Sequence, residues 1–167
     1  DRQGGGGGDL LGDRHVVAVV CTHGHNDHVN AVADLVSETG ATAWLHPDDR
    51  VLWDQSQGDA PGGELEDGQV FTVGDVEATV LHTPGHAPGA CCLDVPALGV
   101  LFSGDTLFSG GPGATGRSYS DFPTIVESIR TRLLSLPGET VVLTGHGDPT
   151  SIGDEAPHLQ EWLDRGH

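Results

Sequence analysis

The stretch "VVAVVCTHGHNDHVNA" constrains this chain more than any other, because an apolar strand leads directly into a turn crowded with metal-ligand side chains. Val16–Val20 is rich in β-branched residues and bounded by polar ones, which predicts a buried strand. Three histidines and an aspartate then follow within six positions, at His23, His25, Asp27 and His28. Residues two apart in an extended segment point the same way, so His23 and His25 can bind one ion while their neighbours reach a second.

The same layout recurs in "ATVLHTPGH", "GVLFSGD" and "TVVLTGHG", where an apolar segment ends and a polar turn carrying His or Asp follows. Strand ends at one edge of a sheet converge in space, and loops at such edges often carry functional sites. We therefore expect the side chains at the four turns to meet. They are His23, His25, Asp27, His28, His86, Asp105 and His146.

Imidazole nitrogens and carboxylate oxygens are the ligands that Zn²⁺ and similar cations prefer. Seven such groups are too many for one zinc ion and suit two ions that share a solvent molecule. A cluster of core or surface histidines without metal would bring several positive charges together at mildly acidic pH. We therefore predict two divalent metal ions, Zn²⁺ first, with iron or manganese accepting the same ligands.

The remaining histidines singled out in the sequence have plainer interpretations. His15 precedes a strand and is expected at the surface. His46 lies in "HPDD", a turn in which a backbone hydrogen bond is the favoured role and the edge of a pocket the alternative. His158 is expected on an exposed helix face, and His167 is terminal.

Strands in runs that alternate with helices indicate an α/β protein built from stacked layers. The predicted strands are Val16–Val20, Thr42–Leu45, Gln69–Val73, Val76–Leu81, Ala90–Val95, Gly99–Phe102 and Thr140–Leu143. The predicted helical segments are Val29–Thr39, Asp48–Trp53, Phe122–Leu136 and Ile152–Leu163.

The length of 167 residues suits one domain, 1–167, with a real hydrophobic core. Residues 15–167 are expected to form that core. Residues 1–14, which include the run Gly4–Gly8, have the composition of a flexible linker or an incomplete N-terminal segment.

The chain carries seven arginines, no lysine and 25 carboxylates, for a formal charge of −18. Such a charge repels polyphosphate and acidic bilayers, so nucleic acid and membrane are poor partners and a small molecule is expected. The three cysteines form neither a disulfide framework nor a zinc motif, which indicates reduced, buried thiols and a cytoplasmic protein.

"THGHNDH", "TPGH", "SGDTLF" and "TGHG", in this order and spacing, resemble the metallo-β-lactamase-fold hydrolases, and most of all their single-domain glyoxalase II-like (hydroxyacylglutathione hydrolase-like) group. The resemblance covers Val16 to Leu163 and implies an αβ/βα four-layer sandwich. The family has several strands ahead of its first motif, and here only residues 1–22 precede His23. We therefore expect either a domain without part of its N-terminal strands or a sequence that omits them.

The resemblance also implies roles for individual residues. Metal one would be bound by His23, His25 and His86, metal two by Asp27, His28 and His146, and Asp105 would bridge both. Asp27 and Asp105 would act in catalysis as well, and Arg117 and Tyr119 fall where relatives place substrate contacts. A surface arginine and a packing tyrosine are the alternative for the last two.

The implied activity is hydrolysis of a thioester, an S-2-hydroxyacyl thiol, by a metal-bridging hydroxide. A leaving thiolate has a pKa of ~8.5 and needs little help from a general acid, which favours a thioester over an amide. The alternatives are a persulfide dioxygenase with one iron, a lactonase, and a metal-binding module without turnover. A true β-lactamase is disfavoured by the aspartate of "SGD", and an RNA-processing nuclease by the negative charge.

Overall fold

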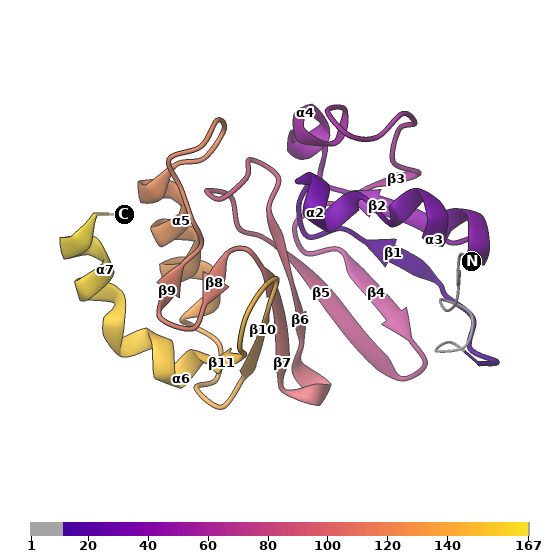
Figure 1. Ribbon diagram of the computed structural model, residues 1–167. Coiled ribbons are helices and arrows are strands. Elements are labelled where there is room, and N and C mark those ends of the chain that lie inside the picture. Colours follow the sequence, from indigo (N-terminus) through magenta and orange to yellow (C-terminus); the bar gives the residue numbers. More distant parts are fainter. Residues whose placement is uncertain (1–11, 167) are drawn as a thin grey trace, which may run out of the picture.

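The computed structural model describes residues 12–166, which form four layers with two sheets inside and helices outside (Figure 1). The predicted α/β class and sandwich architecture are confirmed. Of the linker or incomplete segment predicted at 1–14, residues 12–14 are exposed, and residues 1–11, with the run Gly4–Gly8, lie outside the described residues.

The smaller sheet has three parallel strands in the order β1-β2-β3: β1 (Ala18–Val20), β2 (Thr42–Leu45) and β3 (Gly63–Glu64). Its outer face is covered by α2 (Asn26–Val29), α3 (Val32–Thr39) and α4 (Arg50–Trp53), the last preceded by the 3-10 turn η1 (Pro47–Asp49). Val29, Val32 and Leu45 are buried at this helix–sheet interface. The left-handed Gly40 ends α3, as the sequence predicts.

The larger sheet has the order β11-β10-β7-β6-β5-β4. Its strands are β4 (Val70–Val73), β5 (Val76–His82), β6 (Cys91–Val95), β7 (Val100–Gly104), β10 (Val141–Thr144) and β11 (Thr150–Ser151). A small hairpin, β8 (Leu107–Phe108) and β9 (Gly111–Pro112), follows β7. β7 and β10 are parallel neighbours, so they end at one edge of the sheet although they lie far apart in the sequence.

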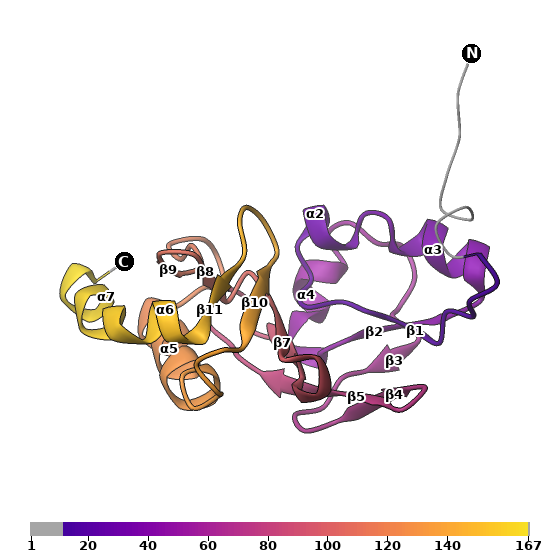
Figure 2. The same cartoon turned by 90° about the horizontal axis from the view of Figure 1, so that it is seen from below.

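Two cores hold this sheet between its neighbours. Leu65, Val80 and Cys91 are buried between the two sheets. On the other face, Ile125, Ile129 and Leu133 are fully buried against the sheet, which is the stripe that their spacing predicts. Figure 2 shows the helices of the C-terminal half on this outer side of the larger sheet, away from α2 and α3.

All three cysteines are free and buried, in agreement with the predicted structural role. Burial raises the pKa of Cys21 and of Cys92 to about 11, so both thiols stay protonated at neutral pH.

Three predicted helices are wrong in their continuity. The helix predicted at Val29–Thr39 begins only at Val32, as α3, and Val29 is the last residue of the separate helix α2. The helix predicted at Ile152–Leu163 is divided into α6 (Ile152–Glu155), η4 (Ala156–His158) and α7 (Leu159–Arg165). This second division occurs because Pro157 removes a backbone donor. The helix predicted at Phe122–Leu136 is α5 (Phe122–Ser128) followed by a π-helical turn, η3 (Ile129–Leu133). The amide of Leu134 bonds the carbonyl of Ile129, five residues back.

The face of the larger sheet that points away from α5 is only partly covered. The smaller sheet covers it at Val80, but Phe102, Val141 and Leu143 are 42%, 41% and 37% exposed. Within residues 12–166, β1 pairs with β2 alone.

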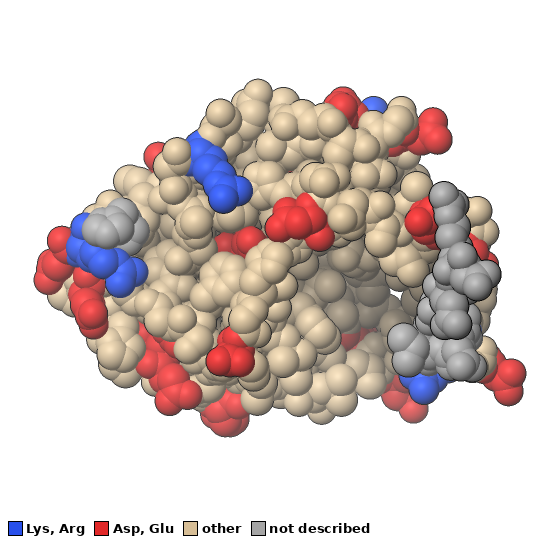
Figure 3. All heavy atoms as spheres, in the orientation of Figure 1, with Lys and Arg blue, Asp and Glu red and all other residues tan. Residues whose placement is uncertain are grey.

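The surface of the molecule reflects its acidic composition. Carboxylates are spread over the face seen in Figure 3, while the arginines there are few and separated. Among residues 12–166, no helix is both long enough and apolar enough to cross a bilayer.

Candidate metal centre

The seven side chains predicted as ligands project from turns at the ends of four strands. His23, His25, Asp27 and His28 follow β1, the last two within the short helix α2. His86 follows β5, Asp105 follows β7 and His146 follows β10. The structure brings all seven together at one edge of the sandwich, in two adjoining groups.

The first group consists of His23, His25 and His86, whose ligand atoms lie within 4.8 Å of one another. Nδ1 of His25 is 3.1 Å from Nε2 of His86, and the ring of His23 meets both other rings edge to face at centroid distances of 4.9 and 5.0 Å. His23 and His86 are buried, with 1% and 6% of their surface exposed. Two of the three imidazoles in this group are thus shielded from solvent.

The second group consists of Asp27, His28 and His146. Nε2 of His28 is 3.0 Å from Nε2 of His146, which in turn is 3.2 Å from Oδ2 of Asp27. The side chains of Asp27 and His146 are 63% and 54% exposed, so this group faces solvent.

Asp105 lies between the two groups. Its Oδ1 is 3.3 Å from Nε2 of His28, and its Oδ2 is 3.6 Å from Nε2 of His86 and 3.8 Å from Nε2 of His146. A Cβ at Gly145 would fall 2.1 Å from Oδ1 of Asp105, so only glycine lets the backbone pass this carboxylate. One aspartate can therefore contact an ion in either group.

Two buried polar atoms show that these residues fit a metal. Nε2 of His23 and Oδ1 of Asp105 have no hydrogen-bond partner among the described residues, a costly state that a bound cation would relieve. Nδ1 of His86 lies 2.8 Å from the carbonyl oxygen of Ala114, which can only accept, so Nδ1 carries the proton and Nε2 keeps its lone pair. Ligand histidines in metal sites are usually oriented by such a hydrogen bond from the ring nitrogen that does not face the metal.

The electrostatics differ between the groups. Burial, together with the neighbouring histidines, lowers the pKa of His23 to about 2, and burial with the charge of His86 lowers the pKa of His25. For His28, burial acts in the same direction, but the carboxylates of Asp105, 3.3 Å away, and of Asp27 together raise its pKa. Burial would raise the pKa of Asp105, but the nearby ring of His28 and the charges of the surrounding imidazoles lower it.

The sequence reasoning missed Asp49, a fully buried carboxylate in η1. Its Oδ2 accepts the amide of Gly24 at 2.7 Å and its Oδ1 the amide of Gly89 at 2.5 Å. Because Gly24 lies between His23 and His25, and Gly89 ends the loop of His86, Asp49 ties together the two turns that carry the first group. The acidic "HPDD" was the only signal in the sequence.

The two predicted substrate contacts differ in placement. Arg117 is exposed, and its charge is close enough to His25 to contribute to the lowered pKa of that residue. Tyr119 is 55% exposed and adopts a left-handed backbone with φ of 70°. Neither residue makes a hydrogen bond or ion pair with the seven side chains, so both substrate contacts stay predictions.

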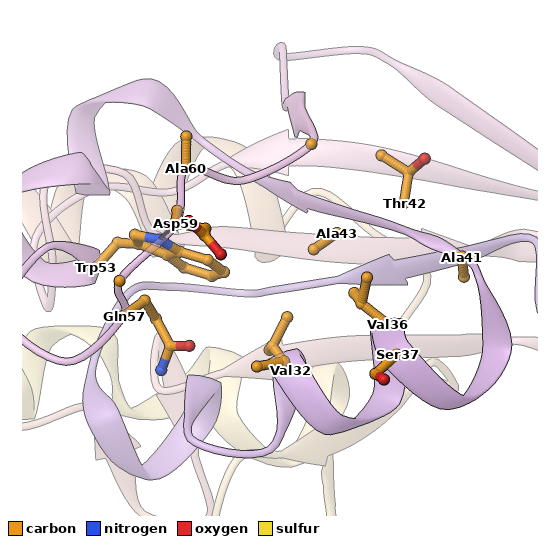
Figure 4. Close-up of a pocket in the computed structure, with 13 residues that line it drawn as sticks. Val32, Val36, Ser37, Ala41, Thr42, Ala43, Trp53, Gln57, Asp59 and Ala60 are labelled. Carbon is orange, nitrogen blue, oxygen red and sulfur yellow. Dashed lines mark hydrogen bonds between the residues drawn. The ribbon is translucent and has the colours of Figure 1, made fainter.

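A cavity of about 450 Å³ lies elsewhere, between α3, β2 and the loop at 57–62. Figure 4 shows Val32 and Val36 on one side of it and the indole of Trp53 on another. None of the seven side chains lines this cavity, so it is not the site of their chemistry.

Comparison with known proteins supports the same conclusion as the geometry. Residues 9–146 match the family model described as the metallo-beta-lactamase superfamily. The hydroxyacylglutathione hydrolase GloC of Haemophilus influenzae is 32% identical over 157 residues, which cover 86% of this chain and 74% of that protein.

Solved structures are also similar. TTHA1623 in a di-iron-bound form is 38% identical over 84% of this chain and 74% of its own, with a TM-score of 0.77. The BLEG-1 B3 metallo-beta-lactamase is 32% identical over 87% of this chain and 77% of its own, with a TM-score of 0.77. ETHE1 from Myxococcus xanthus is 28% identical over 88% of this chain and 63% of its own, with a TM-score of 0.75. From the family match over most of its length and the strand-end histidine clusters, this chain belongs to the metallo-beta-lactamase superfamily.

Proposed function

We propose that this protein is a glyoxalase II-like hydrolase that cleaves a thioester of a 2-hydroxy acid with a water molecule activated between two divalent ions. One observation carries the proposal. Two groups of ligand side chains adjoin, and Asp105 lies within 3.6 Å of a histidine in each. Its similarity to a hydroxyacylglutathione hydrolase supports the substrate class.

Under this proposal His23, His25 and His86 would hold one ion, Asp27, His28 and His146 would hold the other, and Asp105 would be available to both. Bound there, divalent ions would supply water with a pKa lowered to about 7 and Lewis acidity toward a carbonyl. Zn²⁺ is the first choice for this ligand set, and the similarity to a di-iron-bound protein supports iron as the alternative.

The protein's own residues then have two tasks. The exposed carboxylate of Asp27, 3.2 Å from His146, can hold the proton of the attacking water. The carbonyl of Ala114 keeps Nε2 of His86 available as a ligand. A thiolate with a pKa of ~8.5 leaves without a dedicated acid, so the site needs no further proton donor for a thioester.

Arg117 would bind a carboxylate of the substrate near His25, since a guanidinium pairs with carboxylates in a fixed, bidentate geometry. Tyr119, two residues further along the same exposed loop, would contact an apolar part of the substrate. A formal charge of −18 supports a small-molecule partner rather than nucleic acid or a membrane surface. The three free, buried cysteines support a cytoplasmic location.

The second candidate function is persulfide dioxygenation at a single iron, which the similarity to ETHE1 supports. Two adjoining ligand groups favour the hydrolase, because a single ion would leave Asp27, His28 and His146 without a role. Lactone hydrolysis uses the same attack on a carbonyl, and a module that binds metal without turnover is the remaining alternative.

The test is purification with metal quantitation, followed by assay of S-lactoylglutathione beside other thioesters, a lactone and a β-lactam. Two ions per chain with thioester turnover are expected. One iron per chain with oxygen uptake on glutathione persulfide would replace the proposal with the second candidate. Two ions without any hydrolysis would leave only the binding module.

A further inference from the structure

Two histidines outside the metal centre lie face to face. His46 follows β2 and His82 is the last residue of β5, and their rings stack at a centroid distance of 4.0 Å with planes 10° apart. The carboxylate of Asp48 lies 3.7 Å from Nδ1 of His46. Each of the three side chains offers a ligand atom within 4.8 Å of the other two, and none of them belongs to the seven described above.

We propose that His46, Asp48 and His82 form an additional binding site for a divalent transition-metal ion, separate from the dinuclear centre. Two imidazoles and one carboxylate are a three-ligand set that Zn²⁺ accepts, with its fourth position taken by water. The site joins the start of η1, which follows β2 directly, to the end of β5, so an ion there would tie the segment after the smaller sheet to the larger sheet. This inference does not depend on the proposed function.

The tautomer of His82 suits a ligand. Its Nε2 lies 3.0 Å from the carbonyl oxygen of Pro88, so Nε2 carries the proton and the lone pair is at Nδ1. Backbone carbonyls orient ligand histidines in metal sites in this manner. The backbone amide of His82 donates to Oδ1 of Asp67 at 2.9 Å, which fixes the end of the strand.

His46 is also suited to bind a cation. Its side chain is only 11% exposed, and burial and the adjacent His82 lower its pKa, against the carboxylates of Asp48, Asp67 and Glu64. The ring is therefore neutral at neutral pH and keeps a lone pair. Its Nδ1 accepts one long bond, 3.3 Å from the amide of Asp48, which is weak enough for a metal to replace.

The cluster can be reached from solvent. A cavity of about 200 Å³ opens beside His46, with Arg50 and Glu64 among its lining residues. The carboxylate of Asp48 is 60% exposed, so it can turn toward an entering ion.

The buried Asp49 is the sequence neighbour of Asp48, but it supports the first ligand group of the metal centre and not this cluster. Its two oxygens are already engaged by the amides of Gly24 and Gly89, which leaves the neighbouring Asp48 as the carboxylate for the new site.

The test is equilibrium dialysis of the metal-free protein against Zn²⁺, with ions counted per chain. The wild type should bind one Zn²⁺ more than D48N or H82Q, and both variants should keep the ions of the dinuclear centre. Loss of a residue that only hydrogen-bonds a metal ligand lowers metal affinity by about 10- to 100-fold. Loss of a ligand itself should lower the affinity for the additional ion by more than that. D54N and H158Q replace an exposed aspartate and an exposed histidine elsewhere and should bind as the wild type does.

A second measurement uses the melting temperature in a variant, D105A, that is expected to bind no ion at the metal centre of the seven side chains. In D105A, Zn²⁺ should still raise the melting temperature, because an ion that binds only the folded chain stabilises it. The double variant D105A/D48N should lose that increase, and Asp48 is exposed enough for its asparagine replacement to fold. Equal ion counts in the wild type and D48N, or an unchanged Zn²⁺ response in the double variant, would overturn the proposal.

Discussion

The two ligand groups of the metal centre contain three side chains each but differ in how firmly the fold holds them. In the first, His23 and His86 are almost fully buried, and Thr22, Ala114 and the Asp49 bridge support the group from behind. In the second, the side chains of Asp27 and His146 are more than half exposed. Burial and prior hydrogen bonding pre-organise ligands, so the first group should bind its ion more tightly and release it more slowly.

Replacing the residue that both groups share should have the largest effect. D105A should lose both ions and more than about a thousandfold in kcat/KM, because charge stabilisation by bound metal is worth several kcal/mol and each 1.36 kcal/mol is a factor of ten. Metal quantitation and thioester turnover measure this. D75A, in the exposed turn of the β4–β5 hairpin, is the control, and full metal content in D105A would refute the shared role.

A matched pair of histidine variants tests the difference directly. H146A should lose the ion of the second group and keep the ion of the first, and its turnover should fall about a hundredfold. H86A should lose the ion of the first group. In the wild type a chelator should remove metal in two phases. H146A should lack the fast phase, and a single phase in the wild type would show that exposure does not govern release.

Removing one of the two hydrogen bonds that Asp49 accepts from the amides of Gly24 and Gly89 should lower metal binding at the first group alone. The amide side chain introduced by D49N keeps one acceptor oxygen and loses the other, so the turns of Gly24 and Gly89 are held less firmly. The affinity for the first ion should fall about 10- to 100-fold. Metal titration monitors this, and D54N, which replaces an exposed aspartate in an ion pair with Arg50, is the control. An equal loss at both groups would contradict the assignment.

The smallest effect is expected at the substrate. R117A should raise KM by about fivefold with metal content unchanged, since an exposed charge pair contributes about 1 kcal/mol and 1.36 kcal/mol is a factor of ten. R130A, whose arginine pairs with Glu127 on the surface of the C-terminal half, should leave KM unaltered. A change in kcat alone would indicate that Arg117 acts on the centre and not on substrate binding.

The parts of the molecule that the sequence predicts well are local. The strand predicted at Val16–Val20 is present as β1, but it is shorter and half-buried, with Val17 51% exposed. The turn that follows it carries its four ligand side chains as the local pattern predicts. The hairpin at Gly74 and the buried stripe of Ile125 and Ile129 follow from their own spacing as well.

What the sequence does not predict depends on contacts between distant segments. Asp49 reads as one of two adjacent turn aspartates, and only the fold places it between Gly24 and Gly89. His82 reads as the end of a strand until His46 stacks on it. The divided C-terminal helix is different, because Pro157 was visible and its missing donor should have limited the predicted helix.

The hydrogen bond between His86 and the carbonyl of Ala114 links two events that are usually considered separately. Ala114 lies three residues before Arg117, on the loop proposed to receive the substrate. A displacement of this loop on substrate docking would lengthen that bond and loosen the imidazole, which would alter how strongly the ion attracts electrons from its other ligands. Docking and metal reactivity would then be coupled through a single peptide unit, and loop variants chosen for altered specificity should also shift the spectrum of a cobalt-substituted centre.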